Sequence, residues 1–89
     1  MKEIILITTK GCEGCAIMRN SINQALALSN KDIVFEEKDV ENIDKKKLFN
    51  LSITDCPTTL FIKNGIILRR EVGTRPCIVV LRWIDIDFK

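Results

Sequence analysis

The segment Thr8–Met18 (TTKGCEGCAIM) lies between an apolar run and a helical pattern, and it carries two cysteines three positions apart. The run before it, Glu3–Thr9 (EIILITT), is apolar and β-branched over the length of a strand, which is typical of a strand covered on both faces. Glycines interrupt this run, and apolar residues then recur at helical spacing. We therefore expect a strand and then a helix that begins at Cys12 or Gly14 and ends near Leu28.

A second strand and a short helix are expected next along the chain. Asp32–Val40 (DIVFEEKDV) has the composition of a strand, and residues 41–53 (ENIDKKKLFNLSI) predict a short helix capped by Asn42 or Asp44. Because a helix crosses between the first two strands, these strands must be parallel.

Two further strands, Thr58–Lys63 (TTLFIK) and Ile66–Val72 (IILRREV), are expected to pair as a hairpin. They are joined by Asn64-Gly65, and this dipeptide between two apolar runs is the strongest short-range signal of a tight antiparallel turn.

The C-terminal segment fits two patterns. Trp83–Phe88 (WIDIDF) alternates as a strand does. A set of four apolar residues instead falls on one face of a helix: Cys77, Leu81, Ile84 and Phe88. Pro76 suits a first helical turn, and Thr74 is a candidate cap before it. We favour the helix.

Length and composition restrict the class of protein. A chain of 89 residues is expected to form one domain, residues 1–89, with a modest core. With 46% hydrophobic and 29% charged residues it has the composition of a soluble globular protein. A net charge of +2 predicts no nucleic-acid partner, and the short apolar runs predict no membrane segment. We expect a cytoplasmic monomer.

The inventory of reactive side chains is short. There are four cysteines, no histidine and no tyrosine, so a zinc site that uses histidine and a serine–histidine pair are both excluded. In a reducing compartment a structural disulfide framework is not expected, and a close cysteine pair indicates redox catalysis or metal binding.

Four features of the chain occur together and in a fixed order. A CxxC pair, Cys12 and Cys15, separates the first strand from the first helix; Cys56–Thr58 (CPT) opens the third strand; a hairpin is followed by Gly73; and a last helix closes the chain. In these features the chain resembles the thioredoxin-fold family, and in size its small glutaredoxin-like members. The resemblance implies an α/β fold of order βαβαββα, with a mixed four-stranded sheet, helices on both faces and a cis bond before Pro57.

The chain departs from that family around the cysteine pair. Gly11 stands where thioredoxins usually have tryptophan, Glu13-Gly14 replaces their Gly-Pro, and Leu6 occupies the position of a buried aspartate. The Gly-Gly and acidic dipeptide motif with which glutaredoxins bind glutathione is also absent. The resemblance therefore implies the fold and the dithiol, but neither the reductant nor the substrate.

The resemblance implies a thiol–disulfide oxidoreductase that acts as a protein disulfide reductase and needs no cofactor. A thiolate at a helix N-terminus is stabilised by unpaired N–H groups and the helix dipole, so Cys12 is the expected nucleophile and Cys15 the resolving thiol. The expected partners are a protein or small-molecule disulfide and an unidentified reductant. The expected substrate-binding residues are Cys56, Pro57, Gly73 and Thr74.

Three alternatives remain open at the level of the sequence. The two thiols, with Cys56 as a third, would also suit a soft metal ion in a metal-binding module or metallochaperone. The chain could also be a redox-inert binding module on the same fold, or its cysteines could be buried apolar residues. For Cys56, packing and a redox or metal role are both considered. Cys77 and Trp83 are expected in the core.

Overall fold

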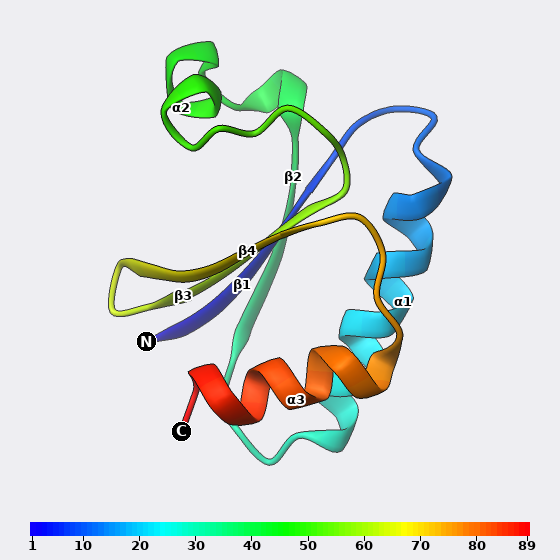
Figure 1. Cartoon of the computed structure of the whole chain (residues 1–89), viewed down its shortest axis with the longest axis vertical. Helices are drawn as coiled ribbons and strands as arrows, with labels where there is room; N and C mark the ends of the chain where they lie inside the picture. Colours follow the sequence, from blue (N-terminus) through cyan, green and yellow to red (C-terminus); the bar gives the residue numbers. More distant parts are fainter.

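The computed structural model describes all residues 1–89 and contains one mixed four-stranded sheet in the order β2-β1-β3-β4 (Figure 1). The elements are β1 (Lys2–Thr8), α1 (Glu13–Leu28), β2 (Val34–Asp39), a 3-10 turn (Val40–Asn42), α2 (Lys45–Asn50), β3 (Thr58–Lys63), β4 (Ile66–Val72) and α3 (Cys77–Asp87). β1 is parallel to β2, and β3 is antiparallel to both β1 and β4. The predicted element order and the parallel first pair are confirmed.

One face of the sheet carries the core. Ile4 of β1 is paired with Phe35 of β2 and with Phe61 of β3, so these three side chains share a face. α1 and α3 cover that face and pack against each other (Figure 1). Nine fully buried residues form the resulting cluster: Ile4, Leu6, Met18, Ile22, Ala25, Phe61, Val80, Ile84 and Phe88.

The C-terminal segment is helical, and the alternative strand is wrong. The fully buried stripe of α3 consists of Val80, Ile84 and Phe88. It therefore includes Val80, whereas the predicted stripe included Leu81, which is only partly buried. Cys77 lies half-buried at the margin of the cluster. The predicted cap is also wrong: Pro76 occupies the N-cap position and no side chain caps the helix.

An aromatic group joins the sheet to α3. The Phe61 ring stacks on Phe88 with centroids 5.5 Å apart and meets the edge of Trp83 at 5.9 Å. The Arg69 guanidinium lies 5.0 Å from the centre of the Trp83 ring and donates from Nε to Asp87 at 2.7 Å. This hydrogen bond raises the pKa of Arg69 above its ordinary value. Trp83 therefore packs against the core, as predicted, and also lies beneath an ion pair.

The predicted hairpin turn has the backbone geometry that its sequence requires. Asn64 and Gly65 have φ values of 52° and 81°, so both central residues lie in the left-handed region that Asn-Gly tolerates. β3 and β4 then pair along their length, with a register shift between Phe61 and Ile62.

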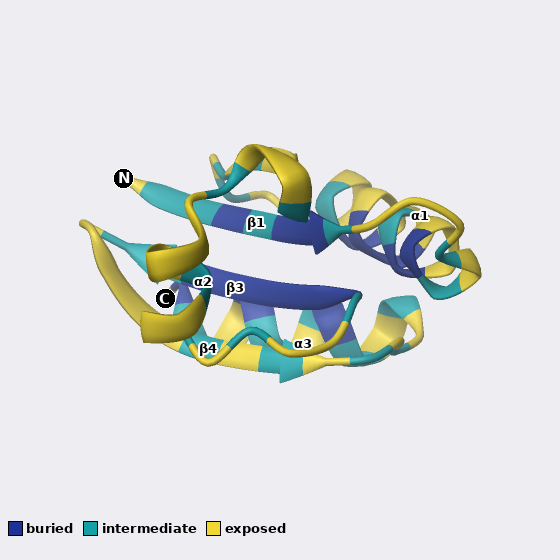
Figure 2. Ribbon diagram, turned by 90° about the horizontal axis from the view of Figure 1, so that it is seen from above, coloured by how far each residue is buried: buried dark blue, intermediate teal, exposed yellow.

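The second face of the sheet is covered only in part. α2 lies on the opposite side of the sheet from α1 and α3 (Figure 1). It has six residues, none of them buried, and its N-cap is Asp44, one of the two predicted caps. Its outer surface and much of β4 are exposed, in contrast to the buried stretches of β1 and β3 (Figure 2). None of the helices combines the length and the apolar character needed to cross a membrane.

Candidate redox site

The two cysteines of the CxxC form a disulfide at the start of α1. Cys12 is the N-cap residue and Cys15 lies in the first turn, with their Cα atoms 5.3 Å apart. The local sequence explains this position: Gly11, with φ of 71°, allows the turn out of β1, and an extended Cys12 starts the helix.

The backbone of the first helical turn is directed at the Cys12 sulfur. The Cys15 N–H donates to Cys12 Sγ at 3.1 Å. The sulfur thus accepts the hydrogen bond that a side-chain oxygen accepts at an ordinary helix N-cap. An N–H donor and the positive end of the helix dipole both favour an anion at this position. When the disulfide is reduced, these groups stabilise the Cys12 thiolate relative to its thiol.

The two sulfur-bearing residues differ in access. Cys15 is 3% exposed and faces the core, whereas Cys12 is only half-buried. A disulfide or thiol from solvent therefore reaches Cys12 before Cys15.

Two segments distant in the sequence border the CxxC at Gly14. A Cβ atom placed on Gly14 would lie 3.3 Å from Pro57 Cδ and 3.3 Å from Thr74 Cγ2. The Gly73 N–H donates to the Pro57 carbonyl at 2.8 Å, which holds these two segments together. The Cys56–Pro57 bond is cis. The structure thus gathers all six residues selected from the sequence around one end of α1. The close approach at Gly14 was not foreseen, because it depends on two distant loops.

Cys56 is a half-buried free thiol beside this site. Burial raises the pKa of Cys56, and the carboxylates of Asp39 and Asp55 raise it further because they disfavour a second negative charge. Both effects favour the thiol form of Cys56 over its thiolate. No three of the cysteine, aspartate and glutamate side chains are arranged to hold a metal ion, so the three-thiolate site considered from the sequence is not formed.

The environment of Cys56 predicts an order of alkylation rates. In a variant that keeps only Cys56, Asp39→Asn should speed its reaction with iodoacetamide at pH 8, because loss of a nearby negative charge lowers the thiol pKa and increases the thiolate fraction. Asp55→Asn should have a smaller effect and Asp32→Asn none. Mass spectrometry of the Cys56 peptide over time gives the rates. Equal rates in all four proteins would contradict the assigned cause.

Comparison with known proteins identifies the fold. No family model matches the chain, and no curated protein matches it. One similar solved structure is that of thioredoxin-2, a component of the malaria parasite protein secretion machinery, and another is that of a malarial protein. The first has a TM-score of 0.81 and 16% identity over 96% of this chain and 82% of its own. The second has a TM-score of 0.79 and 16% identity over 96% of this chain and 94% of its own.

These similarities and the disulfide define the class of the protein. It has a thioredoxin fold, as the resemblance in sequence implied, and it carries a CxxC pair at disulfide distance in a redox-type site. At 16% identity the similarity shows the fold, so the particular activity is argued from the site itself.

Proposed function

We propose that this protein is a thiol–disulfide oxidoreductase that reduces disulfides, with Cys12 as the nucleophile and Cys15 as the resolving thiol. The single observation that carries the proposal is the Cys12–Cys15 disulfide at the N-terminus of α1, where the Cys15 N–H donates to the Cys12 sulfur. The burial of Cys15 supports the same division of roles, because the more accessible sulfur makes the first attack.

The reaction consists of two exchanges. In the first, the Cys12 thiolate attacks one sulfur of the substrate disulfide, that S–S bond breaks, and the departing sulfur leaves as a thiolate that takes up a proton. In the second, Cys15 loses its proton and attacks Cys12 Sγ, which restores the Cys12–Cys15 disulfide and releases the second substrate thiol. The substrate gains two electrons and two protons, and the protein loses them.

Each turnover needs an external reductant to return the pair to the dithiol form. A dithiol or a thiol supplies it by the same exchange in reverse, and a reducing compartment such as the cytoplasm suits this direction. The loops at Pro57 and Thr74, which border the CxxC, are the proposed contact surface for a protein or small-molecule disulfide.

Cys15→Ser provides the test of this proposal. Without the resolving thiol, Cys12 should remain joined to the substrate, so incubation of the reduced variant with a disulfide-containing protein should accumulate a mixed disulfide. Non-reducing electrophoresis and peptide mass spectrometry should place the bond at Cys12. The proposal fails if the adduct forms equally with Cys12→Ser/Cys15→Ser, or if no adduct forms with any disulfide offered.

A further inference from the structure

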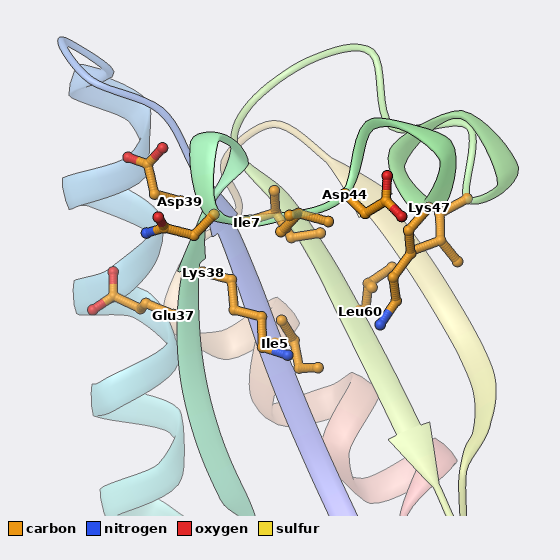
Figure 3. A pocket seen from close by; sticks show the side chains of 11 residues that line it. Ile5, Ile7, Glu37, Lys38, Asp39, Asp44, Lys47 and Leu60 are labelled. Carbon is orange, nitrogen blue, oxygen red and sulfur yellow. The ribbon is translucent and has the colours of Figure 1, made fainter.

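A hollow of about 500 Å³ lies on the sheet face opposite α1 and α3. Its floor consists of three side chains from the two central strands: Ile5, Ile7 and Leu60 (Figure 3). Ile5 and Leu60 are paired across β1 and β3 and so point to the same side. The segment between β2 and β3 forms the wall with Ile43 and Leu51. The hollow exists because the short α2 leaves this part of the sheet uncovered.

The acidic side chains at the hollow have partners of their own. Glu37 accepts a hydrogen bond from the Arg19 guanidinium at 2.6 Å. Asp39 and Asp44 each accept from a backbone N–H two residues further along the chain, at 2.9 and 3.1 Å. The carboxylates of Glu37 and Asp39 also point away from the floor, toward α1 (Figure 3).

The two lysines at the hollow are not paired in this way. Lys47 takes part in no ion pair of the protein. Lys38 has only Glu36, at 3.9 Å between two partly exposed side chains, which is a weak surface pair. Both lysine side chains extend along the hollow, and their ammonium groups lie over Ile5 and beside Leu60 (Figure 3). Two ammonium groups therefore lie at the apolar floor against one carboxylate without an ion pair, that of Asp44, so the balance of unpaired charge there is positive.

We propose that this hollow binds a small free amphipathic carboxylate, with an alkyl chain on the isoleucine and leucine floor and the carboxylate at Lys38 and Lys47. The volume lies within the ~300–1,000 Å³ of small-molecule sites, and an apolar surface with a few polar groups is the usual composition of such sites. The ammonium groups supply the charge complement, and an alkyl chain of about eight carbons suits a site of this size. The proposal does not depend on the redox chemistry at Cys12.

The test uses octanoate as the probe and octanol as its uncharged match. Both are titrated into the oxidised protein while the methyl resonances of Ile5, Ile7 and Leu60 are followed by NMR. Octanoate should give saturable shifts centred on these three residues, and octanol should bind at least about threefold more weakly because it gains no ion pair. Absence of saturation, or shifts centred elsewhere on the protein, would overturn the proposal.

Charge variants of the protein distinguish the contribution of the ligand's carboxylate to binding from that of its alkyl chain. Lys38→Gln/Lys47→Gln should weaken octanoate binding about three- to tenfold and leave octanol binding unchanged. Lys46→Gln is the matched control, because it lies on the same helix outside the hollow, and it should change neither. Equal affinity of the double variant and the unmodified protein for octanoate would refute the assigned role of the lysines.

Discussion

Replacement of Cys12 by serine should abolish dithiol-driven disulfide reduction, with a loss on the order of a thousandfold that brings the rate to the uncatalysed level. The thiolate is the attacking species, and a serine hydroxyl at this position is both a weaker nucleophile and protonated at neutral pH. The helix N-terminus that stabilises a thiolate at Cys12 would then have no thiolate to act on. The reduction of a protein disulfide by dithiothreitol, followed by turbidity or thiol release, measures the effect.

Cys77→Ser is the matched control for this experiment. Cys77 is half-buried, as Cys12 is, but it lies at the start of α3 and forms no disulfide. Its replacement should leave the rate within about twofold, since a thiol outside the site takes no part in the exchange. If Cys12→Ser reduces the substrate as fast as Cys77→Ser does, Cys12 is not the nucleophile.

Truncation of Phe61 to alanine should lower the free energy of unfolding by about 3–5 kcal/mol. Phe61 is fully buried. Its ring contacts both Trp83 of α3 and Phe88, the C-cap residue of that helix. Its loss leaves a cavity between the sheet and the helix, and neighbouring side chains fill such a space only in part. A domain of this size has a total stability of only ~5–15 kcal/mol, so the change is a large share of it.

Urea unfolding followed by tryptophan fluorescence measures this loss, because Trp83 packs on Phe61. Phe49→Ala is the control: Phe49 is 84% exposed, and its removal should change stability by less than about 0.5 kcal/mol. If Phe61→Ala does not fold, Phe61→Leu should still fold and lose less than about 2 kcal/mol, because it keeps most of the volume. A cost for Phe61→Ala no larger than for Phe49→Ala would contradict the described core.

Much of the fold was predictable because its signals are local. The helix that ends at Leu28 and the hairpin around Asn64-Gly65 formed with the expected boundaries, since helical periodicity and turn geometry depend on residues a few positions apart. The C-terminal helix was also expected, but its buried stripe includes Val80 in place of a central Leu81. The sequence pattern indicates a helical face, whereas the angle at which α1 and the sheet meet α3 selects which of two adjacent residues is buried.

The cap of α3 shows the same limit. Thr74 has the residue type of a helix cap, yet it lies against Gly14 instead, and the helix begins after Pro76. A residue type preferred at caps is also preferred in loops, so tertiary contacts decide between the two uses.

By itself, the sequence determined the redox pair and its place at a helix N-terminus, because Cys12 and Cys15 are only three positions apart between a strand signal and a helix signal. Only the tertiary structure decided that Pro57 and Thr74 meet at Gly14 and that the face of the sheet beneath α2 remains hollow. The physical reason is range. Strand register and helix packing bring together residues more than 40 positions apart, and no local preference of those residues specifies the distance between them.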